Sequence, residues 1–439
     1  MGFPDKPSAH LLGANGNASP FFLYSTSLSL SLRLSVSPSY PHPHPHPHTL
    51  PHPRRSSFQL QLHLQAWRLA LSNITSHHAI QSPMPPKLTY QLEAYAALMP
   101  NTCPVHALAY SASPGTYILT GSADRAIRLY NPFPSTSAPG DDRHSIPQGR
   151  LIQNYAAHGY EVLSLSVAAD NERFVSAGGD RSVFLWDVST AVTTKRFGGN
   201  AHGHTARINC VSFAGEGDSI IVSGGFDTSV RLWDTKSSSF KPIQVFDEAS
   251  DAITCLAVRG PEVLAGSVDG RVRSYDIRMG QVTTDVIGAP VTSLSLTRDG
   301  RAMLVGSLDN KLRLMDRDNG SCLRAYTDPA WKNEDVKLQA LLGGKEKYVM
   351  VGDAMAGEAV SKGEGRIWAW DLLTGKLAAK VTVPWGPQGF ELKKKAVGRD
   401  GKEKARSNVV SCMAWREDGW GDQFCVGGTS GVVTVYGAL

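Results

Sequence analysis

Cysteine is scarce in this chain. Its 439 residues include six cysteines, which lie far apart and form neither a Cys-x-x-Cys pair nor a Cys/His cluster at zinc-binding spacing. This pattern favours a reduced, intracellular protein and gives no support to a metal site. Three of the cysteines, Cys210, Cys255 and Cys412, fall in strand-like stretches, where we expect them to serve as small buried apolar side chains.

Long hydrophobic runs and a strong charge of one sign are also missing. The apolar stretch FFLYSTSLSLSLRLSVS is broken by serine at every second residue and contains Arg33, so it predicts neither a membrane span nor an export signal. The 44 Lys and Arg residues nearly balance the 39 Asp and Glu residues. We therefore expect no membrane association and no wholesale binding to nucleic acid.

The motifs of common enzyme classes are absent from the sequence. The stretch LLGGKEK at 341–347 approaches a phosphate-binding loop, but Glu346 stands where Ser or Thr is needed and Gln339 where the first glycine belongs. We find no HExxH, EF-hand, kinase or Gly-x-Ser-x-Gly motif. The expectation is a protein that is not an enzyme, without a cofactor, a metal or a small-molecule substrate.

The first part of the chain differs in composition from the rest. Residues 1–86 are rich in Ser, Leu, Pro and His, include PHPHPHPH at 41–48, and show no helical or strand periodicity. We interpret them as a disordered low-complexity extension. A compact protein is expected over 87–439, and one hypothesis is that residues 1–83 are dispensable or do not belong to the native protein.

One pattern recurs from about residue 88 onward. Two strand-like segments flank an Asp-containing turn, and the second segment ends in an aromatic residue followed by Asp. The pattern occurs in YILTGSADRAIRLYN, RFVSAGGDRSVFLWD, IIVSGGFDTSVRLWD, EVLAGSVDGRVRSYD and AMLVGSLDNKLRLMD, and in degraded form in GEGRIWAWD and CVGGTSGVVTVYG. Repeats of about 40 residues that close on Trp-Asp are typical of four-stranded propeller blades.

On these repeats the chain resembles the WD-repeat family over residues 88–439. The resemblance implies an all-β fold, a seven-bladed WD-repeat β-propeller, and the period-2 apolar alternation agrees with it. The last repeat ends after its third strand, which would leave a blade open. We expect residues 87–95, KLTYQLEAY, to supply the missing outer strand and to close the ring.

The third repeat gathers His, Ser and Asp as a catalytic triad would. In WD-repeat proteins such residues form a buried hydrogen-bond network with Trp. The matching positions are His204, Ser223, Asp227 and Trp233 in the third repeat, and His158, Ser176, Asp180 and Trp186 in the second. A triad would occur once and would need an oxyanion hole, so the recurrence favours a structural role.

The other repeats lack the full network. Asp124, Asp269 and Asp309 keep the turn acid, whereas Glu364 and Ser430 stand in its place in the last two repeats. These blades must satisfy their turns in another way, and we expect them to be less rigid.

The upper face of the propeller is the expected partner surface. The resemblance directs the residue before each turn acid toward this rim, where Phe226, Val268 and Leu308 would form an apolar patch on successive blades. The neighbouring loops would surround the patch with Tyr160, Glu161, Arg207 and Asp251. Such a patch suits a protein partner, although local packing under a loop would explain it equally well.

A basic segment at 391–406 interrupts the step from the sixth to the seventh repeat. Its charges are Lys393, Lys394, Lys395, Arg399, Lys402, Lys404 and Arg406. A solvated loop is the simplest interpretation, and nuclear targeting or contact with RNA phosphates are the alternatives. Without interleaved aromatic residues, sequence-specific binding of nucleic acid is not expected.

Three stretches, EVLAGSVDGRVRSYDIRMGQ, AHGYEVLSL and GSLDNKLRLMDRDNG, resemble a subfamily of mitogen-activated protein kinase organizers. This resemblance implies a non-catalytic scaffold in cytoplasm and nucleus whose partners are kinase-cascade components or spliceosomal proteins. The alternative is a substrate receptor of a cullin ubiquitin ligase. Its adaptor-docking box would be matched by Asp269, Tyr275, Asp276 and Arg278, with Ser274 departing from the pattern.

Overall fold

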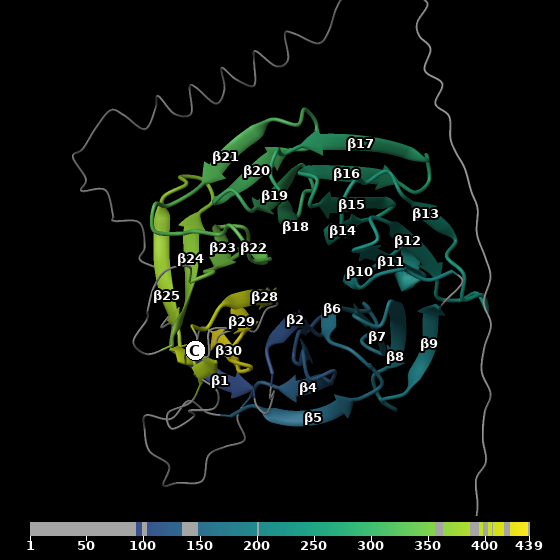
Figure 1. Ribbon diagram of the computed structural model, residues 1–439, viewed down its shortest axis with the longest axis horizontal. Helices are drawn as coiled ribbons and strands as arrows, with labels where there is room; N and C mark the ends of the chain where they lie inside the picture. The colour runs from purple at the N-terminus through teal and green to yellow at the C-terminus, as the bar shows by residue number, and fades with distance from the viewer. Residues whose placement is uncertain are drawn as a thin grey trace, which may run out of the picture. The chain divides into compact units, whose positions relative to one another are not determined.

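The computed structural model describes residues 94–98, 103–133, 148–199, 202–355, 363–386, 395–397, 403–405, 407–416 and 422–437. All of them belong to one compact unit that spans residues 82–439. They form seven four-stranded antiparallel sheets around a centre, and the ribbon in Figure 1 shows the sheets as the blades of a ring. The predicted seven-bladed β-propeller is confirmed. The extension predicted over 1–86 lies outside the described residues.

The strands of the first six blades follow one another along the chain. Blade 1 contains β2 (Val105–Tyr110), β3 (Ile118–Ser122), β4 (Ile127–Asn131) and β5 (Arg150–Tyr155); blade 2 contains β6 (Val162–Val167), β7 (Arg173–Gly178), β8 (Ser182–Asp187) and β9 (Thr193–Gly198); blade 3 contains β10 (Ile208–Ala214), β11 (Ile220–Gly225), β12 (Val230–Asp234) and β13 (Gln244–Phe246). Blade 4 contains β14 (Ile253–Arg259), β15 (Glu262–Ser267), β16 (Arg271–Asp276) and β17 (Gln281–Val286); blade 5 contains β18 (Val291–Leu296), β19 (Ala302–Ser307), β20 (Lys311–Asp316) and β21 (Cys322–Tyr326); blade 6 contains β22 (Ala340–Gly343), β23 (Tyr348–Gly352), β24 (Gly365–Asp371) and β25 (Leu377–Val383).

The two middle strands of each blade are more deeply buried than simple alternation predicts. All six residues of β19 are buried, for example, because both faces of a blade pack against a neighbouring blade. The interface between blades 2 and 3 joins Val175 of β7, Phe213 of β10 and Trp233 of β12 in one apolar cluster. The outer strands, such as β17, are largely exposed. The core is therefore a ring of inter-blade clusters.

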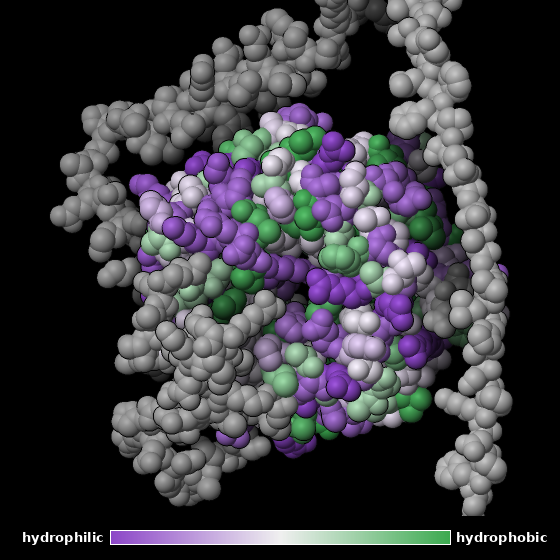
Figure 2. Space-filling model, in the orientation of Figure 1, coloured by the Kyte–Doolittle hydropathy of each residue, from purple (hydrophilic) through white to green (hydrophobic). Residues whose placement is uncertain are grey.

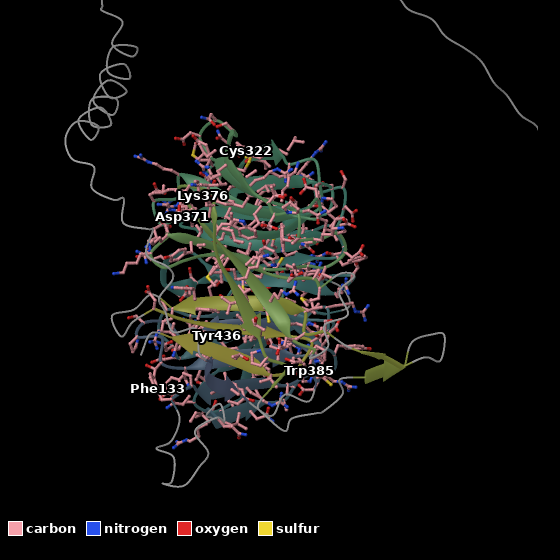
Figure 3. The ribbon with its side chains drawn as sticks, turned by 90° about the vertical axis from the view of Figure 1, so that its left-hand side faces the viewer. Phe133, Cys322, Asp371, Lys376, Trp385 and Tyr436 are labelled. Atoms are coloured by element: carbon pink, nitrogen blue, oxygen red, sulfur yellow. The ribbon has the colours of Figure 1, made fainter. Side chains whose placement is uncertain are left out.

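The seventh blade is built from both ends of the described chain. It contains β28 (Val410–Arg416), β29 (Gln423–Gly428), β30 (Val433–Gly437) and β1 (Ala94–Leu98), in the order β1-β30-β29-β28. In the antiparallel register of β1 and β30, Leu98 lies opposite Val433. Tyr436 of β30, labelled in Figure 3, is buried against blade 6, where its hydroxyl donates to the Thr382 carbonyl at 3.3 Å.

The described part of this closing strand extends three residues beyond the end of the predicted range 87–95. Only Ala94 and Tyr95 fall in both ranges, and residues 87–93 lie outside the described residues. The alternation of Leu88, Tyr90 and Leu92 suggested a strand, whereas Ala97 and Leu98 supply the buried apolar contacts of β1. Alanines carry a weak strand signal, and this explains why the sequence pattern did not extend the strand to Leu98.

Part of the basic segment 391–406 forms a short hairpin between blades 6 and 7. Its strands are β26 (Lys395–Val397) and β27 (Glu403–Ala405), which pair antiparallel. Two of the predicted basic residues, Lys395 and Lys404, fall in these strands, and the other five lie outside the described residues. Among the described residues, no helix has the length and apolar character that crossing a membrane requires.

Candidate functional site

The predicted network of blade 3 forms a continuous chain of hydrogen bonds. The Nδ1 atom of His204 lies 2.8 Å from Oδ1 of Asp227, and its Nε2 atom lies 2.8 Å from Oγ of Ser223. Trp233 donates from Nε1 to the same Ser223 oxygen at 2.8 Å. The backbone N–H of Thr205 donates to the second Asp227 oxygen at 2.9 Å. The network thus joins the loop before β10 to the turn between β11 and β12.

Blade 2 repeats this arrangement. His158 lies 2.5 Å from Asp180 and 2.7 Å from Ser176, and Trp186 donates to Ser176 at 2.8 Å. Ser176 and Ser223 are both fully buried. A serine nucleophile must reach its substrate, and here each hydroxyl is enclosed and already occupied by an indole N–H. The geometry therefore supports a structural network.

The remaining blades with a turn Asp use an arginine that sequence reasoning overlooked. Four residues after each such Asp, an Arg on the third strand forms an ion pair with it. The pairs are Arg128–Asp124 at 2.9 Å, Arg273–Asp269 at 2.8 Å and Arg313–Asp309, and blade 3 adds Arg231–Asp227 at 3.4 Å. The signal was present as Asp-x-x-x-Arg in four repeats. These turns are held without a complete His network.

These arginines also influence the ionisation of the turn acids. Burial by itself raises the pKa of Asp269 and Asp309, but hydrogen bonds from Arg273 and Arg313 outweigh it and place the pKa of each carboxyl below its ordinary value. Both acids are therefore charged at neutral pH and pair with a charged guanidinium.

Blade 6 shows that the prediction for Glu364 was wrong. The residue that accepts the buried hydrogen bonds is Asp353, which follows β23 directly. Its Oδ2 atom accepts from Trp368 Nε1 at 2.9 Å, and its Oδ1 atom accepts from the Met355 N–H at 2.8 Å. Asp353 is 4% exposed, whereas Glu364 is half-buried. The long turn before Gly365 separates Glu364 from this position in sequence and obscured the match.

Blade 7 satisfies its turn with neutral side chains. Ser430 donates its backbone N–H to Oδ1 of Asn408 at 3.2 Å, and its hydroxyl accepts from the Val432 N–H at 3.2 Å. Thr429 accepts from the Val409 N–H at 2.9 Å through its hydroxyl. Ser430 therefore stands in the turn as expected, and the buried Asn408 supports it.

The rim residues before each turn acid are fixed by one recurring backbone hydrogen bond. In blade 3 the N–H of Phe226 donates to the Arg207 carbonyl at 2.8 Å, in blade 4 Val268 donates to Ala252 at 3.0 Å, and in blade 5 Leu308 donates to Pro290 at 3.0 Å. Blades 1, 2 and 7 have the same bond from Ala123, Gly179 and Thr429. Each rim position is thus anchored to the loop that enters the inner strand.

Only part of the predicted apolar patch is open to solvent. Phe226 is 52% exposed, and the guanidinium of Arg207 lies 5.1 Å from its ring centroid. Val268 and Leu308 are half-buried. Phe226 is therefore the accessible apolar side chain, and the exposed Arg207 stacks on it.

Tyr160 extends the rim on blade 2. It is 64% exposed and covers Gly179, since a Cβ atom on that glycine would lie 2.6 Å from the Tyr160 Cβ. Glu161 is half-buried beside it, and Asp251 is exposed on blade 4. The structure hence places the seven predicted rim residues on the loops and turns of blades 2 to 5, with two exposed aromatic side chains among them.

A cavity of about 560 Å³ occupies the centre of the ring, lined by residues of six inner strands and, in blade 6, by the segment that enters β22. Figure 2 shows one face of the ring, where hydrophilic side chains surround a central hollow. Lys337 of blade 6 donates from Nζ to the Asn209 carbonyl of blade 3 at 3.1 Å. Burial lowers the pKa of His106 at this wall, with Glu161 opposing the shift and Lys337 adding to it. The sequence pattern did not indicate Lys337 as a cavity residue.

The residues of the predicted ligase-docking box lie at opposite ends of β16. Asp269 precedes the strand and pairs with Arg273, while Tyr275 is buried and stacks on Phe246 with ring centroids 4.4 Å apart. Asp276 ends the strand and accepts the N–H of Arg278 at 2.8 Å. Arg278 is exposed. The side chains of Asp269 and Asp276 therefore have partners within blade 4, and Tyr275 packs against blade 3.

Among the described residues, no group of three His, Cys, Asp or Glu side chains is placed to hold a metal ion. The cysteines at positions 210, 255, 412 and 425 are buried, and burial raises the pKa of the Cys255 thiol to about 11. A thiol in this state is a weak nucleophile.

Comparison with known proteins agrees with this geometry. The WD40 family, described as WD domain, G-beta repeat, matches residues 94–131, 149–187 and 196–234. WD repeat domain-containing protein 83 of Rattus norvegicus is 39% identical over 269 residues, which cover 61% of this chain and 76% of that protein. The chain belongs to the WD-repeat family. Each matched segment begins in an outer strand and ends on the third strand of the next blade, so the WD repeat is offset from the blade by one strand.

Other relatives within the WD-repeat family support this placement. WD repeat domain-containing protein 83 of Homo sapiens is 36% identical over 272 residues, which cover 62% of this chain and 77% of that protein. Autophagy-related protein 16 of Arabidopsis thaliana is 27% identical over 303 residues, which cover 66% of this chain and 53% of that protein. The names of the two WD repeat domain-containing protein 83 relatives confirm the expected resemblance to the kinase-organizer subfamily.

Proposed function

We propose that this WD-repeat protein is a non-catalytic scaffold that assembles multiprotein complexes through the upper rim of its propeller. The observation that carries the proposal is the exposed Phe226, whose backbone is anchored to Arg207 and whose ring lies under that guanidinium. Aromatic and Arg side chains are the residue types that contribute most to protein interfaces. The blade network beneath them keeps the platform rigid.

The rim chemistry suits a protein partner with an apolar centre and a polar surround. Phe226 and Tyr160 present ring surface, and Arg207, Glu161 and Asp251 offer charges around it. Burying the two rings on binding removes apolar surface from water, and charges at the edge of the contact contribute mainly to orientation and association rate. This supports recognition of a folded or extended protein surface.

The test compares two phenylalanines of the same blade. Phe226→Asp should abolish capture of protein partners from the native source, because the new carboxylate would be buried without a partner in the contact. Phe240, which is 55% exposed and lies outside the rim, provides the control Phe240→Asp. Leu308 is half-buried, so Leu308→Asp would perturb folding and is a poorer probe. Equal capture by both variants would refute the rim as the binding surface.

The kinase-organizer resemblance supports kinase-cascade components or spliceosomal proteins as partners, in cytoplasm and nucleus. Affinity purification of the native protein with mass spectrometry tests this identity separately from the surface. Recovery of kinases selects signalling, recovery of spliceosomal proteins selects splicing, and recovery of neither refutes both assignments.

The basic segment 391–406 is a separate proposal for placement in the nucleus or near RNA. Replacing its Lys and Arg residues by Ser should lower the nuclear fraction or the recovery of splicing complexes. The fold should persist, because among the described strands β26 and β27 pair with each other and with no strand of a blade. Unchanged localisation and recovery would leave the segment as a solvated hairpin.

A cullin ligase receptor is the second candidate function. One observation favours it: Arg278 is exposed at the end of β16, directly after the turn that Asp276 holds. The packing of Tyr275 against blade 3 and the ion pair of Asp269 within blade 4 are explained by the propeller fold, so they lend no support of their own.

A further inference from the structure

A pocket of about 330 Å³ lies at the lower end of the ring, opposite the mouth that contains His106 and Arg207. Strand β2 runs from one mouth of the ring to the other. His106, near the start of the strand, marks the upper mouth, and Tyr110, its last residue, marks the lower mouth. The pocket is lined where the inner strands of blades 1, 5, 6 and 7 end, by residues that include Tyr110, Arg298, Trp415 and Arg416. It is therefore separate from the proposed partner rim.

Arg416 is the central residue of this pocket. It is the last residue of β28 and is 5% exposed. Its Nη1 atom donates to the Gly115 carbonyl at 3.2 Å, and its Nε atom has no hydrogen-bond partner in the part of the chain that the structure describes. No described carboxylate forms an ion pair with it, unlike the arginines of the blade turns. Among the described residues, this buried guanidinium therefore has no counter-charge.

Two further buried donors belong to the same pocket. The Nε1 atom of Trp415 also lacks a hydrogen-bond partner among the described residues, whereas the Tyr110 hydroxyl has the Cys425 sulfur as its partner. The Trp415 ring is held in place by stacking on Phe424, with centroids 5.1 Å apart. Burial and the nearby Cys425 raise the pKa of Tyr110 well above its ordinary value, so its phenol keeps the proton and remains a donor.

The acceptors of the pocket do not offset these donors. Glu346 lines the pocket and accepts the backbone N–H of Arg298 through Oε1. This carboxylate is therefore engaged on blade 5, whereas the two donors without partners lie on blade 7. Two donors without partners at one pocket, one of them on a charged guanidinium, fit a ligand that supplies acceptors and carries negative charge.

We propose that this lower pocket binds an oxyanion, a carboxylate or phosphate group of a small molecule, with Arg416 as its principal ligand. The oxyanion accepts from Arg416 Nε and Trp415 Nε1 and supplies the missing counter-charge. Leu296 and Leu342 form apolar parts of the wall, so the pocket also accommodates a short carbon skeleton attached to the anion. This inference is independent of the partner rim.

Titration of the full chain with inorganic phosphate and, separately, with acetate tests the proposal, with sodium chloride at matched ionic strength as the reference. Thermal unfolding and calorimetry are the readouts. We expect saturable binding of at least one anion and an increase in melting temperature with its concentration. Preference for phosphate or for acetate distinguishes the two sources of the group.

Three variants locate the site. Arg416→Gln should weaken anion binding by about tenfold or more, and Trp415→Phe, which keeps the ring and removes the N–H, by a smaller factor. Arg301 is exposed and follows the pocket residue Arg298 closely, so Arg301→Gln should bind as the wild type does. If circular dichroism shows that Arg416→Gln is unfolded, Trp415→Phe decides. Absence of saturable binding by either anion, or unaltered binding by folded pocket variants, overturns the proposal.

Discussion

The Nδ1 atom of His204 and the Oδ1 atom of Asp227 lie 2.8 Å apart and join the loop before β10 to the turn between β11 and β12. Both side chains are shielded from solvent. Burial lowers the pKa of His204, and the hydrogen bond to Asp227 offsets only part of that effect. Burial alone would raise the pKa of Asp227, but the hydrogen bonds from His204 and the Thr205 N–H hold it well below its ordinary value. A neutral imidazole beside a charged carboxylate is the state that we expect at neutral pH.

The folded protein should lose stability as the pH falls below neutral. The unfolded chain takes up a proton at His204 near the ordinary pKa of 6.5, before the folded protein does. The stabilising contribution is therefore complete above pH 6.5 and decreases as the pH falls through the lower folded pKa. His106 acts in the same direction. Melting temperatures between pH 7.5 and about pH 5 measure the slope.

Replacing His204 by Gln should make that slope shallower, because the amide keeps polar contacts but does not titrate. The control is His202→Gln, since His202 is exposed two residues away and should leave the slope unchanged. An equal slope in wild type and His204→Gln would contradict this assignment.

Asp353 should matter more to the stability of blade 6 than Glu364. Asp353→Ala leaves the buried N–H groups of Trp368 and Met355 without an acceptor, so we expect a loss of about 2 to 4 kcal/mol of unfolding free energy. Glu364→Ala, at a half-buried position, should change it by about 0.5 kcal/mol or less. Chemical denaturation of the two variants gives the comparison, and a larger loss for Glu364→Ala would restore the original assignment.

Ring closure can be tested by two truncations that differ by five residues. A chain that begins at residue 94 retains β1 and should melt close to the full chain. A chain that begins at residue 99 lacks Ala97 and Leu98 and exposes the edge of β30, so its melting temperature should fall by roughly 10 °C or more, or it should aggregate. Similar destabilisation of both truncations would show that residues 87–93 share in closing the ring.

The ligase function depends on Arg278. Arg278→Ala should abolish binding to a cullin adaptor while leaving the melting temperature unchanged, because the side chain is exposed and only its backbone N–H bonds to Asp276. Arg271→Ala, at an exposed position on the other end of β16, is the matched control. A pull-down with purified adaptor measures binding, and failure of the wild type to bind removes this function from consideration.

The repeat pattern predicted most of the fold because the sequence of each repeat marks where its strands end. Asp187, Asp234, Asp276, Asp316 and Asp371 all terminate third strands, as the repeats indicated. The His–Ser–Asp–Trp spacing likewise places its members correctly, since all four lie within one blade and its entry loop. Such contacts lie within one repeat, so the repeat pattern predicts them without information on how the ring closes.

Features that depend on the closed ring were less accessible to sequence reasoning. Arg416 occupies an ordinary position in the strand VSCMAWR, and only the convergence of four inner strands gives it a pocket. Leu308 matches Phe226 in its repeat yet is half-buried, because exposure at the rim depends on neighbouring loops of other blades. The Asp-x-x-x-Arg spacing is present in the sequence, but the network of the WD-repeat family predicted His rather than Arg as the partner of the turn acids.

The pairing of β1 with β30 also sets an order of events during synthesis. At roughly 5 to 20 residues per second, a ribosome takes tens of seconds to proceed from Leu98 to Val433. Throughout that interval blades 1 to 6 can form from consecutive strands, whereas β1 has no partner to pair with. The nascent chain therefore carries an unpaired strand until β30 has been synthesised, and this is the period in which a chaperone would have most to protect.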